Sequence, residues 1–173
     1  MERLWSPWRL AYVTSTSNTP EGCIFCAVSS PAQGEQGDPW RDRLVLVHGD
    51  TCYVILNLYP YNNGHLMVVP RRHIASLTLA TPEELNELMA FTRDAEAALT
   101  EAYRPQGINV GMNLGQPAGA GIADHMHIHL VPRWTGDTNF MSVVGNTRVL
   151  PEDMDATAAR LRPIFERLRR ARS

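Results

Sequence analysis

The chain has 173 residues, of which 44% are hydrophobic and 20% charged, and its formal net charge is −2. This length suits one well-buried domain, so we expect residues 1–173 to form a single unit. Because the charge is small and the basic residues are scattered outside the arginine-rich end, no nucleic-acid partner is expected. The sequence shows neither an apolar run of bilayer length nor a basic and apolar leader, and we expect a cytoplasmic protein with no membrane partner.

The cysteines predict a reducing compartment. There are three, an odd number, which argues against a secreted disulfide framework. Cys23 and Cys26 form a C-x-x-C pair, a spacing that suits metal or redox chemistry, whereas Cys52 lies in an apolar run and is predicted to be a small core residue. The pair belongs to an N-terminal segment, residues 1–42, that is predicted to be irregular because it is rich in tryptophan at its start and in Gly, Pro, Gln and Ser near its end.

Alternating apolar residues predict short strands in two parts of the chain. The first three cover residues 44–47, 51–58 and 65–69, separated by turn-forming residues. Two more are predicted at 108–113 and 124–131, on either side of a glycine-rich turn at 115–121.

Two helices are predicted. The first begins with the capping pattern of Thr81, Pro82 and Glu84. Apolar residues at helical spacing extend it to about Tyr103, with one face packed on the sheet. The second covers residues 153–170 within a C-terminal helical extension, residues 151–173, and Pro163 should kink or divide it.

The order of these elements predicts the fold class. Three strands, one long helix, two strands and a C-terminal helix indicate an α+β fold with an antiparallel sheet. Parallel pairing is not expected, because the short hairpin connections leave no room for crossovers.

Three histidines alternate with apolar residues in the run His125-Met126-His127-Ile128-His129. In a strand, alternate side chains share a face, so the three imidazoles should face a common site. They could ligate a metal, cluster by chance, or include a nucleophile oriented by its neighbours. Chance is the weakest explanation, because these are three of only six histidines in the chain. The glycine-rich turn upstream has amides that could cradle an anion, which favours a nucleophile acting on a phosphate.

The run from His125 to Val131 resembles the signature of the histidine triad superfamily, and the resemblance covers most of the chain. It implies the fold of that superfamily over residues 1–173. It also implies that His127 is the nucleophile, that His129 contacts phosphate as a catalytic partner, and that His65 supports the triad.

The same resemblance implies a nucleotide-binding set. Its members are Asn57, Asn113, His129 and the loop Gly119, Ala120, Gly121 and Ile122, whose amides would donate to phosphate oxygens. Two of these residues have simpler interpretations. Asn57 could cap the turn that follows it, and Asn113 could be a hydrogen-bonding residue at a strand end.

A zinc site is also implied by resemblance, in this case to zinc-bearing histidine triad proteins. The ligands would be Cys23, Cys26, His73 and His125. A closed site of two cysteines and two histidines would be structural, since no position is left for substrate or water. The alternative is a pair of reduced, unliganded thiols. No cofactor is expected for catalysis.

Two segments, Leu4 to Arg9 and Pro132 to Phe140, resemble a bacterial branch of the superfamily associated with diadenosine tetraphosphate phosphorylases and hydrolases. The resemblance implies a small-molecule nucleotide substrate, attack on its α-phosphate, and a nucleotidyl-histidine intermediate resolved by inorganic phosphate or by water. The loop Gly119-Ala120-Gly121 lacks a hydroxyl where some members carry serine, which argues against phosphorolysis. A homo-oligomer is expected from the same resemblance.

Three other functions remain open from the sequence. The first is hydrolysis of adenosine phosphoramidates or aminoacyl adenylates through the same intermediate. The second is a non-catalytic nucleotide sensor, although such a protein would be expected to lack His127. The third is a metallohydrolase that uses the triad as metal ligands.

Overall fold

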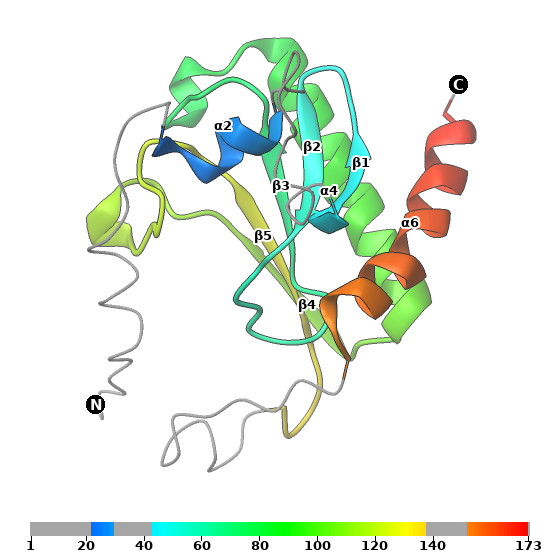
Figure 1. Cartoon of the computed structure of the whole chain (residues 1–173). Coiled ribbons are helices and arrows are strands. Elements are labelled where there is room, and N and C mark those ends of the chain that lie inside the picture. Colours follow the sequence, from blue (N-terminus) through cyan, green and yellow to red (C-terminus); the bar gives the residue numbers. More distant parts are fainter. Residues whose placement is uncertain (1–21, 30–42, 138–151, 173) are drawn as a thin grey trace, which may run out of the picture.

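The computed structural model describes residues 22–29, 43–137 and 152–172 (Figure 1). The tryptophan-rich start and the Gly- and Pro-rich stretch that closes the predicted irregular segment lie outside these ranges. Five strands form one antiparallel sheet in the order β1-β2-β3-β5-β4. They are β1 (Val45–His48), β2 (Cys52–Leu56), β3 (Leu66–Pro70), β4 (Gly107–Gly111) and β5 (Ile128–Arg133). The predicted α+β class with an antiparallel sheet is confirmed.

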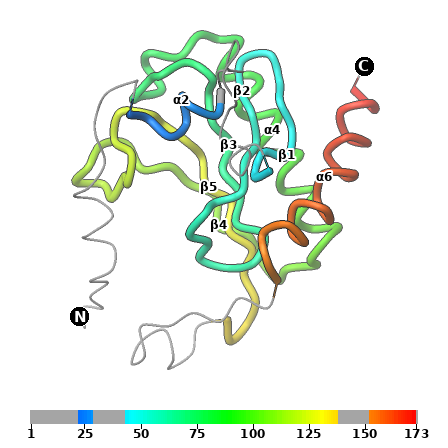
Figure 2. Tube along the Cα trace, viewed as in Figure 1, coloured from blue at the N-terminus to red at the C-terminus, as the bar shows by residue number. Residues whose placement is uncertain are grey.

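The chain path brings β5 to an interior position of the sheet. Strands β1, β2 and β3 follow one another as hairpins, and β5 then enters between β3 and β4 (Figure 2). In this register Met67 of β3 lies opposite His129 of β5. The last histidine of the triad is therefore held by strands on both sides.

Strand β5 begins later than predicted, at Ile128 instead of residue 124. The backbone just before it forms hydrogen bonds outside the strand ladder. The Met126 amide donates to the Ile74 carbonyl (2.7 Å), and the His125 carbonyl accepts from Nδ1 of His127. Because these groups are already used, His125 and His127 lie in an irregular segment that leads into the strand.

Helix α4 (Pro82–Tyr103) begins as predicted. The Thr81 hydroxyl accepts from the Glu84 amide (3.3 Å), and the Glu84 carboxylate accepts from the Thr81 amide (2.8 Å), which forms a complete capping box. The helix contacts β2, β3 and β5, and its buried apolar residues include Leu88, Phe91, Ala95 and Leu99.

Helix α6 (Met154–Arg170) packs against both α4 and β1 (Figure 1). Asp153 caps its first turn by accepting from the Ala156 amide (2.7 Å). The helix is continuous through Pro163, so this proline does not divide it, and the kink that the sequence also allowed stays a prediction. Among the described residues, no helix is both long and apolar enough to cross a membrane.

The N-terminal segment contains a helix that the sequence did not predict, α2 (Ile24–Ser29). It lies on the side of the sheet away from α6 in the view of Figure 1. Two short 3₁₀ helices complete the described elements, η2 (Leu77–Leu79) after β3 and η3 (Gln116–Ala118) in the glycine-rich turn.

Candidate active site and metal centre

His127 is buried, with 5% of its surface exposed. Its Nδ1 lies 2.9 Å from the carbonyl oxygen of His125. A carbonyl oxygen can only accept, so Nδ1 carries the proton and Nε2 carries a lone pair. Burial holds the pKa of His127 below its usual value, although the bond to the His125 carbonyl acts in the opposite direction. The result is a neutral imidazole with one basic nitrogen, the form that a nucleophile requires.

His129 and His65 form a directed hydrogen-bond chain. The Tyr61 amide donates to Nδ1 of His65 (3.1 Å), so the proton of His65 is on Nε2. That Nε2 lies 3.0 Å from Nδ1 of His129, which must accept. In neutral His129 the proton is then on Nε2. The ring centroids of His129 and His127 are 4.7 Å apart, so a ring that carries a proton donor packs against a ring that carries a basic nitrogen.

The two asparagines have structural contacts. The Asn57 side-chain oxygen accepts from the Tyr59 amide (3.0 Å), which is a turn cap, while its nitrogen lies 3.3 Å from Nδ1 of His65. Asn113 donates to the Gly119 carbonyl (3.2 Å). Asn57 therefore contacts a histidine of the site and Asn113 holds the glycine-rich loop, and their roles toward a nucleotide stay predictions.

The glycine-rich loop folds back on itself. Gly119 has φ of +91°, a left-handed conformation that favours glycine, and it ends the 3₁₀ turn η3. The Gly119 amide donates to the Gln116 carbonyl (2.9 Å), and the Ala120 amide donates to the Gly115 carbonyl (3.3 Å). In this structure two of the predicted phosphate-binding amides thus serve the loop itself.

Cys23, Cys26, His73 and His125 gather in one cluster, with their ligand atoms all within 4.8 Å of one another. Nδ1 of His125 is 3.3 Å from Sγ of Cys23, and Nδ1 of His73 is 3.2 Å from Sγ of Cys26. Two thiols and two imidazoles are a donor set typical of structural zinc. The predicted ligands therefore come together from a short helix and the residue before it, a loop, and the irregular segment that precedes β5.

The protonation of His125 fits a metal ligand. Its Nε2 lies 2.8 Å from the Pro70 carbonyl and must donate, which leaves Nδ1 unprotonated and facing the sulfurs. Burial, opposed by that backbone bond, lowers the pKa of His125 to about 4, so the ring is neutral. Burial and the neighbouring Cys23 raise the pKa of Cys26 to about 11, so a cation would have to displace its proton.

Sequence reasoning missed three groups at this site. The ring of Phe25 lies 4.8 Å from that of His127, the Tyr61 amide sets the proton position of His65, and the Pro70 carbonyl does the same for His125. Contacts made by backbone groups give no residue-type signal in a sequence. Phe25 does give a signal, because it is an aromatic residue placed between two candidate ligands.

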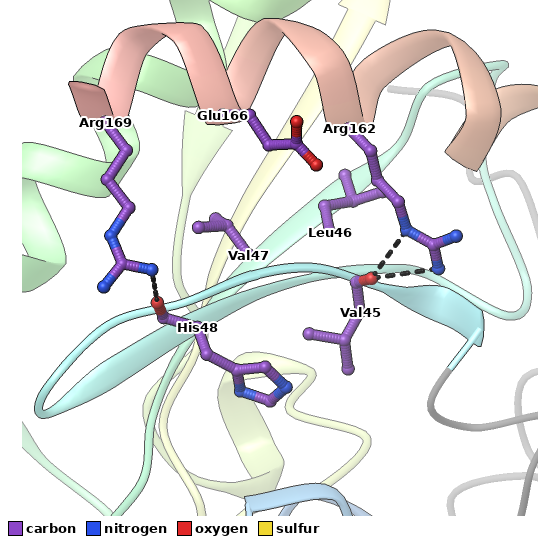
Figure 3. A pocket seen from close by; sticks show the side chains of 7 residues that line it. All are labelled: Val45, Leu46, Val47, His48, Arg162, Glu166 and Arg169. Carbon is purple, nitrogen blue, oxygen red and sulfur yellow. Dashed lines mark hydrogen bonds between the residues drawn. The ribbon is translucent and has the colours of Figure 1, made fainter. Parts of the chain in front are cut away.

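A surface hollow of about 370 Å³ lies away from the triad, between β1 and α6 (Figure 3). Figure 3 shows Arg162 and Arg169 of α6 reaching over the strand to its carbonyl groups. None of the triad histidines lines it, so this hollow is a helix contact and not part of the histidine site.

Two named proteins are similar to this chain in sequence. The AP-4-A phosphorylase of Mycobacterium tuberculosis is 43% identical over 155 residues, which cover 88% of this chain and 78% of that protein. A bis(5'-adenosyl)-triphosphatase of Dictyostelium discoideum is 26% identical over 136 residues, covering 74% of this chain and 91% of that protein.

The fold is also similar to that of solved structures. A Zn-bound histidine triad family protein from Mycobacterium smegmatis superposes with a TM-score of 0.66 at 25% identity, covering 88% of this chain and 99% of that one. The model of the HIT domain family matches residues 41–136. With this match over more than half of its length, the chain belongs to the HIT domain family.

Proposed function

We propose that this protein is an enzyme that cleaves dinucleoside polyphosphates such as diadenosine tetraphosphate at the α-phosphate, through a nucleotidyl-histidine intermediate on His127. The observation that carries the proposal is the buried, neutral His127 with its lone pair on Nε2, beside the proton donor His129. The names of two relatives, an AP-4-A phosphorylase and a bis(5'-adenosyl)-triphosphatase, support this class of substrate.

The reaction would take two displacements. Nε2 of His127 attacks the α-phosphorus, an N–P bond forms, and the bond to the bridging oxygen breaks so that ATP leaves. An oxygen of inorganic phosphate or water then attacks the same phosphorus and the N–P bond breaks. Phosphate as acceptor gives ADP, and water gives AMP. Dividing one displacement into two is the general advantage of a protein nucleophile.

His129 would stabilise the negative charge that develops on the α-phosphate oxygens. With its Nδ1 accepting from His65, its Nε2–H can donate to such an oxygen. Backbone amides of the loop Gly119–Ile122 would add to this stabilisation, those of Gly119 and Ala120 after leaving their present partners. Asn57 and Asn113 would hold the surrounding segments against the nucleotide.

The cluster of Cys23, Cys26, His73 and His125 would hold a structural zinc ion, which is supported by the donor set and by a Zn-bound relative of similar fold. When bound, the ion would fix the position of α2 and of the segment before β5, because its ligands come from both. A closed four-ligand site offers no position to substrate, so the ion would be structural. The ion would take no chemical part in either displacement.

Two observations disagree on whether inorganic phosphate or water is the acceptor in the second displacement. The relative at 43% identity is named a phosphorylase, which favours inorganic phosphate. The missing hydroxyl in Gly119-Ala120-Gly121 favours water. We propose phosphorolysis. The similarity to the phosphorylase extends over the whole site, whereas the missing hydroxyl concerns one loop position.

Product analysis tests the proposal. The protein is incubated with diadenosine tetraphosphate, with and without inorganic phosphate, and the nucleotides are separated by chromatography. ADP and ATP formed only with phosphate are expected. AMP and ATP formed regardless of phosphate would establish a hydrolase instead, and turnover of an adenosine phosphoramidate with none of the dinucleotide would overturn the substrate class.

A pair of histidine variants provides the control. His127→Asn should abolish turnover and retain nucleotide binding. His48→Asn removes an exposed histidine of β1 and should behave as wild type. Substantial residual turnover in His127→Asn would remove His127 from the role of nucleophile.

A further inference from the structure

Phe25 lies between the two cysteines of the cluster and contacts the nucleophile. Its side chain is buried, with 2% exposed. Its ring centroid is 4.8 Å from that of His127 at an interplanar angle of 53°, and 5.3 Å from that of His125 at 68°. One aromatic ring therefore touches both a candidate metal ligand and the proposed nucleophile.

The helix that carries Phe25 depends on outside contacts for its position. With six residues, α2 is far shorter than the roughly 12 to 15 residues an isolated helix needs in water. The buried Tyr53 hydroxyl donates to the Phe25 carbonyl (2.9 Å). On either side of Phe25, the sulfurs of Cys23 and Cys26 lie 3.3 and 3.6 Å from Nδ1 of His125.

A histidine nucleophile needs its ring plane held. The χ2 angle of histidine, which sets the orientation of the ring, has a broad and roughly two-fold distribution. It therefore offers little intrinsic restraint on the ring plane. The bond from Nδ1 to the His125 carbonyl fixes one edge of the His127 ring. The rings of Phe25 and His129 pack against it at 4.8 and 4.7 Å and limit its rotation.

We propose that Phe25 is a positioning residue that holds the imidazole of His127 in its attacking orientation, and that the cysteine–histidine cluster acts on the nucleophile through it. The proposal rests on the proposed function for the role of His127. It assigns α2 a part in the reaction beyond anchoring the N-terminal segment: the helix places an aromatic ring against the reacting group.

Phe25→Leu tests the first part, because leucine keeps apolar volume and removes the flat ring. The kcat for diadenosine tetraphosphate should fall roughly 10- to 100-fold, as small misplacements of reacting groups do, with KM changed by less than about twofold. Phe91→Leu is the matched control: it removes a buried phenylalanine (5% exposed) in α4 and should leave kcat unchanged at a similar loss of melting temperature.

Nitrogen NMR of the histidine rings gives a second readout that needs no substrate. Wild type should show one fixed His127 tautomer, with Nδ1 protonated. Phe25→Leu should show averaging between tautomers or a displaced Nε2 signal, and Phe91→Leu should not. Tyr53→Phe keeps the Phe25 ring and removes only the hydroxyl that holds its carbonyl, so it should give the same change to a smaller extent.

Double variants test the second part. Cys26→Ala should shift the His127 signals as Phe25→Leu does, and adding it to Phe25→Leu should cause no further shift, since both act through one contact. Additive shifts would overturn the coupling. If the His127 signals in Phe25→Leu are the same as in wild type, the positioning role is overturned. If wild type shows no turnover, yet the fixed His127 tautomer is lost in Phe25→Leu, only the proposed function is contradicted.

Discussion

At the scale of single residues, Glu87 closes the turn between β1 and β2. Its carboxylate accepts from the amides of Asp50 (2.9 Å), Thr51 and Cys52 (2.7 Å) and from the Thr51 hydroxyl (2.6 Å). A Cβ on Gly49 would lie 2.3 Å from a Glu87 oxygen, so glycine leaves room for the carboxylate. A side chain of α4 thus fixes a turn in the sheet on which it packs.

Glu87→Gln should destabilise the fold by roughly 2–3 kcal/mol, because an amide group would face donors that now meet a carboxylate. Urea unfolding measures this, and Glu96→Gln, at an exposed position of the same helix, should be near neutral. Burial of Glu87 opposes ionisation, but the hydrogen bonds from Thr51 and the amides of the turn outweigh it and hold its pKa below 4.5.

The pH dependence follows from that direction. A carboxyl with a lower pKa in the folded state stabilises the fold above the ordinary pKa of 4.5, and this contribution disappears as the pH falls through the lower folded-state pKa. The difference between wild type and Glu87→Gln should therefore be full at neutral pH and shrink in acid. A difference that does not change with pH would contradict the assigned role.

The sequence predicted which residues are candidates for the site, but not the contacts that set their proton positions. Alternate spacing identified His125, His127 and His129 as a group, because the period of a strand is local. Their proton positions depend on the carbonyl of Pro70 and the amide of Tyr61, which reach the site only through the fold. Such backbone partners carry no residue-type signal.

At the scale of elements, α6 covers the β1 edge of the sheet. β1 is an edge strand, and unpaired strand edges promote pairing with other chains. The Arg162 guanidinium donates to the Val45 carbonyl (3.1 Å) and also to that of Arg43, and Arg169 donates to the His48 carbonyl (3.1 Å), as Figure 3 shows for Val45 and His48. The helix therefore satisfies edge carbonyls that a second strand could otherwise use.

Arg162→Ala should lower the free energy of unfolding by about 1–2 kcal/mol and increase self-association, since it leaves strand carbonyls without a donor. Sedimentation velocity across a concentration series measures the association. Arg170→Ala is the control on the same helix, because its pair with Glu166 (3.5 Å) is exposed and contributes little. Equal association in both variants would show that Arg162 does not protect the edge.

Element boundaries were predictable where side chains set them. The capping box at Thr81 and Glu84 fixed the start of α4, and Asp153 fixed that of α6. Helix α2 was missed because it is held by tertiary contacts, and β5 starts late because the Met126 amide pairs with Ile74 instead of a strand. In each miss a distant partner determined the local structure.

At the scale of the whole molecule, the cysteine–histidine cluster joins the N-terminal helix to the centre of the sheet. It should bind one zinc ion per chain and raise the melting temperature, because the four ligands are brought together only in the folded state. Cys26→Ala should lose the metal and the added stability. Cys52→Ala removes a buried thiol outside the cluster and should retain the metal. Metal content measured on both variants decides the ligand set.

The topology of the molecule could be predicted only in part. The antiparallel class followed from the short hairpin connections. The insertion of β5 between β3 and β4 did not, because it depends on pairing between segments such as Met67 and His129 that are far apart in sequence. The homo-oligomer expected from the family resemblance stays a prediction.

Detection of the covalent intermediate tests the account most directly. Wild-type protein is mixed with diadenosine tetraphosphate in the absence of inorganic phosphate, quenched in alkali, and digested for mass spectrometry. The account predicts an added AMP unit on the peptide that contains His127, labile to acid, and its absence from His127→Asn. A substrate-consuming enzyme with no adduct at any time, or with an adduct that persists in His127→Asn, would contradict His127 as the nucleophile.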